Sequence, residues 1–147
     1  GPKNVIKAMT SFQSHATSGA NSIAQYAAAT ALSCGDKYIL SMIDEYNGRR
    51  KLMHRLVNEI DGMSCKLPKG AFYIMASLKE IIGRAYKGQV ITGSTRFAEL
   101  LLDEKHVAVV PALAFGDDNY IRLSYATSRQ NIVDGMARMK QFVSELD

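Results

Sequence analysis

The feature that most constrains the fold of this chain is a long amphipathic helix predicted over residues 36–60. Its apolar side chains recur at three- and four-residue steps, and the basic run 49–51 falls mostly between them. Asp36 is suited to cap the start of this helix, and Gly62 is suited to end it. An apolar face of this length must be covered by a sheet or by another helix. Its apolar positions are Ile39, Met42, Ile43, Tyr46, Met53, Leu56, Val57 and Ile60.

Two shorter helical patterns precede the long helix. Residues 5–12 and 23–32 keep helical spacing, and the small, polar run 14–21 between them favours caps and turns. We therefore expect residues 1–34 to form an interdomain helical segment with a polar elbow. Residues 35–147 are expected to form one structural unit.

Three short strands are predicted after the long helix, each bounded by turn residues. Ser94 or Thr95 can cap a helix between them, Ser128 can cap a last helix, and residues 79–93 read as a mostly irregular, mobile connection. This order predicts an α+β (or α/β) domain of two layers, in which a short mixed or antiparallel sheet is covered by helices on one face. The predicted strands are residues 71–75, 107–110 and 120–125.

Charge and cysteine usage argue against several classes of function. The formal net charge is +4 and the basic residues are spread along the chain, so we expect no nucleic-acid groove. No run approaches the roughly 18 apolar residues of a membrane span, and no signal-peptide pattern is present. Cys34 and Cys65 lack the paired spacing of a zinc site, and the histidines are scattered, so we expect no metal. Two reduced thiols fit a cytoplasmic protein.

The strand at 120–125 contains the position that points most clearly to chemistry. Period two places Ile121 and Leu123 on one face and Arg122 on the other. Helices should cover the apolar face, so the guanidinium of Arg122 projects from the opposite side. There its fork could grip a carboxylate through two parallel hydrogen bonds. From the pattern alone, a surface arginine on a half-exposed sheet is the simpler interpretation.

Several blocks of the sequence follow one another in the order and at the gaps of a known family. Residues 68–73 form a P-x-G-A-F-Y block, residues 109–116 resemble a V-P-G-x-x-F-G turn, and residues 121–126 resemble an arginine strand. The chain resembles the C-terminal small domain of class I, fold-type I aminotransferases of the aspartate aminotransferase type. It departs at Gly19-Ala20, where the family has Asn-Pro, and at Ala112, where it has glycine. Further matching blocks are residues 1–7, 14–18 and 22–28.

The resemblance implies roles for individual residues. Arg122 matches the arginine that binds the α-carboxylate of the substrate, and Phe72 matches an aromatic residue near the substrate. Thr17, Ser18 and Asn21 match a segment near the dimer interface and the partner's active site. The resemblance therefore reverses the simpler interpretation of Arg122 as a surface residue.

The resemblance also implies pyridoxal 5'-phosphate, bound as a Schiff base to a lysine that would lie upstream of Gly1. No lysine here has the family's Ser-Lys context, so we expect this fragment alone to be inactive and to hold no covalent cofactor. The parent would be a cytoplasmic homodimer that transfers an amino group from an amino acid to a 2-oxo acid. Two alternatives stay open: a free-standing carboxylate-binding or interaction module, and the small domain of a related lyase or synthase that uses the same cofactor.

Overall fold

The computed structural model describes residues 1–147, which form two compact units, Gly1–Ser41 and Met42–Asp147. The boundary between the units falls within helix α3 (Lys37–Asn58). That residues 35–147 form one structural unit stays a prediction. No helix combines the length and the apolar character that crossing a bilayer requires.

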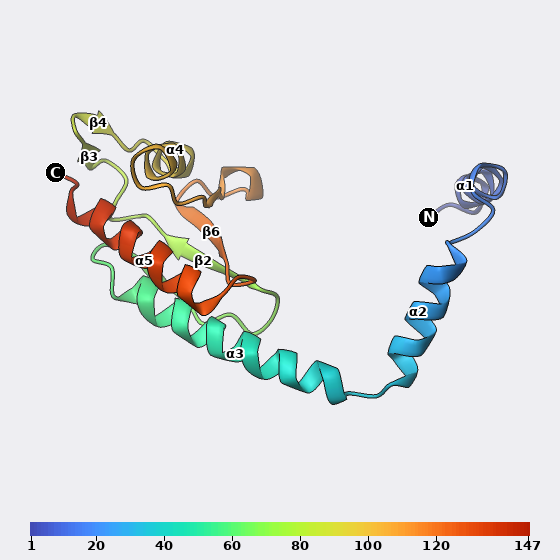
Figure 1. The fold of residues 1–147 in the computed structure, drawn as a ribbon. Helices are drawn as coiled ribbons and strands as arrows, with labels where there is room; N and C mark the ends of the chain where they lie inside the picture. Colours follow the sequence, from blue (N-terminus) through green and yellow to red (C-terminus); the bar gives the residue numbers. More distant parts are fainter. The chain divides into compact units, whose positions relative to one another are not determined.

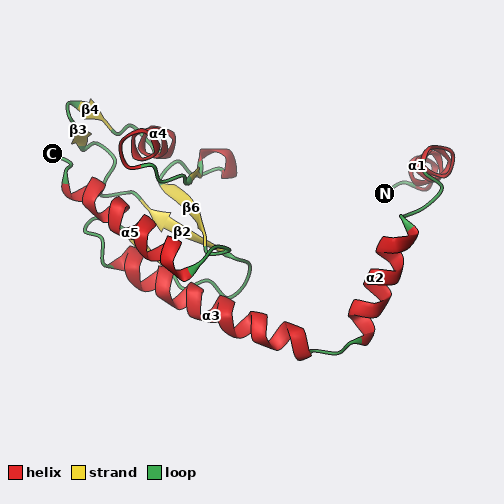
Figure 2. Ribbon diagram, in the orientation of Figure 1, coloured by secondary structure: helices red, strands yellow, loops and turns green.

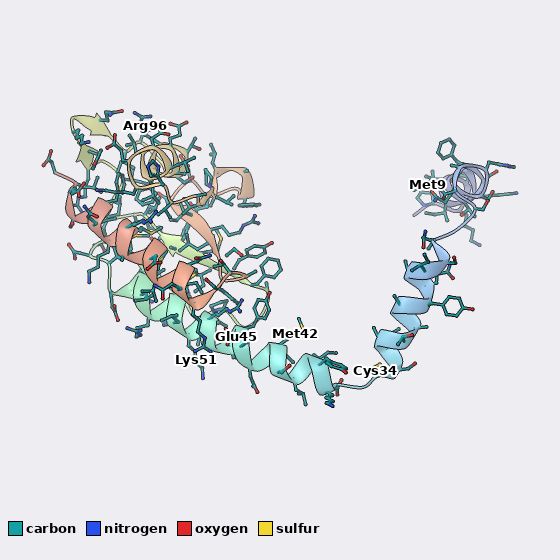
Figure 3. All side chains as sticks on the ribbon, viewed as in Figure 1. Met9, Cys34, Met42, Glu45, Lys51 and Arg96 are labelled. Atoms are coloured by element: carbon teal, nitrogen blue, oxygen red, sulfur yellow. The ribbon has the colours of Figure 1, made fainter.

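The first unit consists of α1 (Lys3–Ala16), α2 (Ser22–Ser33) and the start of α3, and it confirms the two helices predicted there. Asn21 caps α2, because its Oδ1 accepts hydrogen bonds from the backbone N–H of the second and third helical residues at 2.9 and 3.3 Å. Neither helix has a buried residue: Phe12 is 76% exposed and Leu32 is 88% exposed. Met9 projects freely from α1 (Figure 3). The unit therefore has no hydrophobic core.

A four-stranded antiparallel sheet forms the centre of the second unit, with the strand order β1-β2-β6-β5. Figure 2 shows its two central strands, β2 and β6. The two longest strands, β2 and β6, are neighbours and pair from Tyr73 opposite Ser124 to Ser77 opposite Tyr120. All strand pairs are antiparallel, which settles the choice between a mixed and an antiparallel sheet. The strands are β1 (Ser64–Cys65), β2 (Tyr73–Ser77), β5 (Val110–Pro111) and β6 (Tyr120–Ser124).

Helices cover one face of this sheet and confirm the predicted two-layer α+β fold. Figure 1 shows α3 and α5 (Arg129–Ser144) side by side over the sheet, and α4 (Ser94–Lys105) packs against α5 and β5. The predicted cap of α5 is confirmed, because Ser128 Oγ accepts a hydrogen bond from Asn131 N at 3.1 Å. The core joins residues of the sheet and all three helices, among them Val57, Ile74, Phe97, Ile121, Leu123, Met139 and Phe142.

Three sequence predictions were wrong in their details. The strand predicted at 71–75 begins at Tyr73, because Ala71 adopts the left-handed conformation (φ 59°), which cannot extend a ladder. The strand predicted at 107–110 is reduced to the two residues of β5. In the first half of α3, Ile39, Met42 and Ile43 are exposed, so only the second half of its apolar face contributes to the core.

The connection at 79–93 is an anchored hairpin and not the irregular segment that the glycines suggested. It contains β3 (Ala85–Tyr86) and β4 (Gln89–Val90) and buries Ile81, Tyr86 and Ile91 in the core. Two carbonyls at the end of α5 accept hydrogen bonds from Arg84 Nη2, at 3.3 and 2.8 Å. These apolar anchors outweigh the local flexibility that glycine confers.

The N-terminus of α4 is capped by a residue that is distant in sequence. Gly93 occupies the N-cap position, whereas Ser94, predicted as a cap, is the first helical residue and is buried. Asp118 Oδ1 accepts hydrogen bonds from Ser94 N at 2.9 Å and from Ser94 Oγ at 2.6 Å. A carboxylate at this end of a helix is favoured by the helix dipole. This contact ties α4 to the turn that leads into β6.

We expect Gly93→Ala to destabilise the chain by about 1–3 kcal/mol. A Cβ at this position would lie 2.0 Å from Asp118 Oδ2, so the capping carboxylate would have to leave. Gly135→Ala is the matched control: no atom lies within 4 Å of its added Cβ, and alanine stabilises a helix interior by about 0.5–1 kcal/mol. Urea unfolding followed by circular dichroism measures both. Equal effects of the two substitutions would contradict the assigned cap.

An ion-pair cluster joins the beginning of α5 to α3. Glu45, labelled on α3 in Figure 3, accepts hydrogen bonds from Arg129 Nη2 and Arg49 Nε, both at 2.8 Å. Gly48 leaves room for the guanidinium of Arg129, since an added Cβ would lie 2.4 Å from its Nη2. Arg129 first and Arg49 second lower the pKa of Glu45 from 4.5 to about 2.

The stability that Glu45 contributes should therefore depend on pH in the acid range. Its pKa is lower in the folded chain, so the contribution is fully present above the ordinary value of 4.5 and is lost as the pH falls to about 2. We expect the difference in unfolding free energy between the unsubstituted chain and Glu45→Gln to shrink over this range. High salt should reduce the difference, because the pair is exposed. A difference that stays constant through this range would contradict the assignment.

Candidate functional site

Arg122 lies in the middle of β6, on the face of the sheet that no helix covers. Its neighbours along the strand, Ile121 and Leu123, are buried in the core, so the alternation predicted from the sequence is confirmed. Met75 on β2 and Val110 on β5 are its partners across the sheet. The backbone of Arg122 is thus held between two neighbouring strands, and its side chain lies on the open face of the sheet.

Two aromatic rings contact the guanidinium of Arg122. Its Cζ lies 4.3 Å from the centroid of the Tyr73 ring and 4.4 Å from the centroid of the Phe115 ring. Tyr73 belongs to β2, and Phe115 ends the short 3-10 helix η1 (Leu113–Phe115). Both distances are within the range of about 6 Å in which a cation is attracted to a ring.

The side chain of Arg122 makes no hydrogen bond or ion pair within the chain. Its Nε–H is buried without a partner, which ordinarily costs about 1–3 kcal/mol. Its terminal nitrogens form no ion pair with a carboxylate of the chain either. The chain therefore presents a charged fork whose N–H donors are unused, and a carboxylate is the ligand that such a fork fits best.

The loop before β2 is fixed by two residues that the sequence analysis did not single out. Arg50 Nη1 donates a hydrogen bond to Pro68 O at 2.5 Å, and the Tyr125 hydroxyl donates to Ala71 O at 2.7 Å. Tyr125 N donates to Phe72 O at 2.9 Å. Burial raises the pKa of the Tyr125 hydroxyl, and the charge of Arg50 opposes this. Tyr125 falls on the same buried face as Ile121 and Leu123, and a buried tyrosine hydroxyl needs a hydrogen-bond partner. The sequence could have indicated this contact in that way.

The other residues expected near the substrate are placed as follows. Phe72 is 42% exposed, and its ring centroid lies 4.2 Å from that of Tyr73, so it extends the aromatic surface beside Arg122. Thr17, Ser18 and Asn21 lie in the polar turn of the first unit, where Ser18 has a φ of 61° and Asn21 caps α2. Phe72 thus packs on Tyr73, and Tyr73 contacts Arg122. In the polar turn, Thr17 ends α1 and Asn21 caps the start of α2.

The departure from the family pattern at Ala112 does not distort the turn that carries Phe115. Ala112 has a φ of −89°, which an alanine adopts freely, and its side chain is fully buried. Its N–H donates to Tyr120 O at 3.0 Å, so the turn is tied to the start of β6. Gly116, with a φ of 93°, supplies the left-handed residue that ends it.

An open groove lies on the same face of the sheet, with a volume of about 630 Å³. Tyr73 and Met75, two neighbours of Arg122, contribute to its wall. Exposed Lys66 and Lys79 add positive charge, and Lys79 Nζ lies 5.7 Å from the centroid of the Tyr120 ring. The groove offers space and positive charge beside the arginine fork, which suits an anionic ligand.

Neither the lysines nor Cys65 of this chain are prepared for covalent chemistry. Every lysine is exposed except Lys105, which is half-buried and pairs with Glu145 at 2.7 Å, so none has the desolvated position of a nucleophilic lysine. Burial raises the pKa of the Cys65 thiol, although a hydrogen bond from Asn58 opposes this, so its reactive thiolate is disfavoured. The residues present therefore fit a site that binds a carboxylate, and they do not fit the lysine-held cofactor itself.

Comparisons with known proteins identify the family of this chain. The sequence model of the family described as aminotransferase class I and II matches residues 1–138. The aspartate aminotransferase of Streptomyces avermitilis is 43% identical over 145 residues, which cover 99% of this chain and 36% of that protein. A probable aspartate/prephenate aminotransferase of Rickettsia prowazekii is 42% identical and is matched over 99% of this chain and 37% of its own length.

The fold of this chain is also similar to that of solved aminotransferases. The crystal structure of the aspartate aminotransferase of Rhizobium meliloti superposes with a TM-score of 0.92 and 36% identity, over 100% of this chain and 37% of that one. The chain thus spans little more than a third of the length of the relatives it matches. With a family match that covers most of its residues, and with a fold shared along its whole length, the chain belongs to the class I and II aminotransferases.

Proposed function

We propose that this chain is the small domain of an aminotransferase that moves an amino group from an amino acid to a 2-oxo acid, and that Arg122 binds the α-carboxylate of both substrates. The observation that carries this proposal is the unused fork of Arg122 on the open face of the sheet. A buried donor without a partner is costly to keep, so a binding role explains why it is retained.

Aspartate is the amino acid that we propose to test first, because all three relatives described above have aspartate in their names. A dicarboxylic substrate also suits the surroundings of Arg122. Beside the fork, the groove carries the positive charges of Lys66 and Lys79. Phe72 and Tyr73 supply an aromatic wall that limits the access of water to the bound carboxylate.

The cofactor proposed for the whole enzyme is pyridoxal 5'-phosphate, which supplies an electron sink for breaking bonds at the α-carbon. The lysines of this chain do not fit the role of its covalent partner. The part played by this chain is therefore to bind and orient. Arg122 would hold the carboxylate shared by amino acid and oxo acid, so that the α-carbon is presented to the cofactor in one orientation.

We further propose a cytoplasmic homodimer. The two cysteines are unpaired, which suits a reducing compartment. The exposed apolar residues of α1 and α2, such as Phe12, Ile23 and Tyr26, suit coverage by another part of an assembly. Thr17, Ser18 and Asn21 lie between these two helices, which supports placing them near the dimer interface.

Arg122→Gln in the full-length enzyme should lower kcat/KM for aspartate by roughly 100-fold or more, because it removes the charged partner of the carboxylate. Arg122→Lys should give an intermediate loss, since an ammonium group keeps the charge without the fork. Arg138→Gln removes an exposed arginine on α5 and is the matched control. Steady-state kinetics with saturating 2-oxo acid measures all three. An Arg122→Gln enzyme that keeps the kcat/KM of the control would contradict the proposal.

The 147-residue chain alone, mixed with pyridoxal 5'-phosphate, should show no transamination beyond that of the free cofactor. Its exposed lysines lack the desolvation that makes a lysine a competent nucleophile. Amino-group transfer from aspartate, followed by chromatography of the products, tests this. Transfer by the chain at a rate above the cofactor blank would show that one of these lysines is catalytic.

A further inference from the structure

The guanidinium of Arg122 is held without hydrogen bonds, unlike those of other arginines in the second unit. Arg84 is fixed by N–H bonds to carbonyls at the end of α5, and Arg129 is fixed by the carboxylate of Glu45. Arg122 has no such bond, and its Nε has no partner. The contacts that orient its guanidinium are with the ring pair, Tyr73 and Phe115.

The ring pair is itself rigidly placed. Tyr73 is paired with Ser124 at the end of the β2–β6 ladder, and the ring of Phe72 packs against it. The turn that carries Phe115 is braced by backbone hydrogen bonds, from Phe115 N to Ala112 O at 2.8 Å and from Gly116 N to Leu113 O at 3.0 Å. Leu113 N also donates to Ser94 Oγ at 3.3 Å, which links this turn to the capped start of α4.

The rings do not serve mainly to fill the core. Phe115 is 54% exposed, and Tyr73 is half-buried on the face that no helix covers. Replacing either ring by an aliphatic side chain removes little packing from the interior. What it removes is the surface against which the guanidinium rests.

A guanidinium that rests on aromatic faces keeps its in-plane N–H donors available. An arginine side chain has about 2 kcal/mol of rotamer entropy to lose when it is fixed, and fixing it before binding removes that cost from the binding step. Resting on the proposed function, we propose that Tyr73 and Phe115 are positioning residues that orient Arg122 before the substrate carboxylate arrives. They orient Arg122 and do not bind the substrate themselves, whereas Arg122 binds its carboxylate.

The test uses the full-length enzyme with its cofactor and two amino donors: aspartate, and the corresponding amine that lacks the α-carboxylate. The measured quantity is the ratio of kcat/KM for aspartate to kcat/KM for the amine. Partial unfolding lowers both rates together and leaves the ratio unchanged, whereas a weaker grip on the α-carboxylate lowers the ratio. The variants are Phe115→Leu and Tyr73→Leu, with Tyr73→Phe as the conservative variant that keeps the ring.

We expect each leucine variant to lower the ratio by about 3- to 30-fold, which is the range of a cation–ring contact. Tyr73→Phe should keep the ratio within about twofold, because the ring face is preserved. Tyr38→Leu is the matched control: it removes an exposed aromatic ring from α3, outside the groove, and that ring also interacts with a lysine, Lys37, at 6.0 Å. In an Arg122→Gln background, Phe115→Leu should have no further effect on the ratio.

The outcomes separate this inference from the proposed function. If Arg122→Gln itself leaves the ratio unchanged, the proposed carboxylate site is wrong. If Arg122→Gln lowers the ratio but Phe115→Leu and Tyr73→Leu leave it at the Tyr38→Leu value, Arg122 binds the carboxylate without help from the rings, and the inference is overturned. A Tyr73→Phe enzyme as impaired as Tyr73→Leu would also overturn it, since the hydroxyl and not the ring would then matter.

Discussion

The pairing of β2 with β6 is the constraint on which the rest of the second unit depends. Its register places Ala76 opposite Ile121 and Ile74 opposite Leu123, so four apolar side chains face the helices together. The same register places Met75 opposite Arg122 on the other face. Because side chains alternate along a strand, a slip of one residue would expose the core and bury the guanidinium. The packing of the core and the position of Arg122 are therefore specified by one set of backbone hydrogen bonds.

Much of this arrangement could be predicted from the sequence because it is encoded locally. The alternation around Arg122 predicted both faces of β6, and Ser128 predicted the start of α5. The cap of α4 could not be predicted in this way, because Asp118 lies 24 residues from Ser94 and reaches it only once the turn before β6 has formed. The hairpin at 79–93 was missed for a related reason: its glycines suggest flexibility, whereas its stability comes from apolar side chains that contact distant parts of the core.

The residues of the candidate site also differ in whether the sequence alone could indicate them. Arg122 could be identified because its strand pattern and the family resemblance point to one position. Phe115 could not, since its approach to Arg122 depends on a short turn braced by Ser94 and Tyr120. Arg50 reads from the sequence as part of a solvated basic run, yet its guanidinium bonds a carbonyl 18 residues away in the loop before β2. Charged residues on a helix face reveal such roles only when the partner backbone is known.

The most direct test of the central claim is a crystal structure of the full-length enzyme with an unreactive dicarboxylic acid bound. We expect one carboxylate to accept hydrogen bonds from the terminal nitrogens of Arg122, with the guanidinium still resting on the rings of Tyr73 and Phe115. A carboxylate bound to other residues, with Arg122 left without a ligand or moved off the two rings, would contradict it.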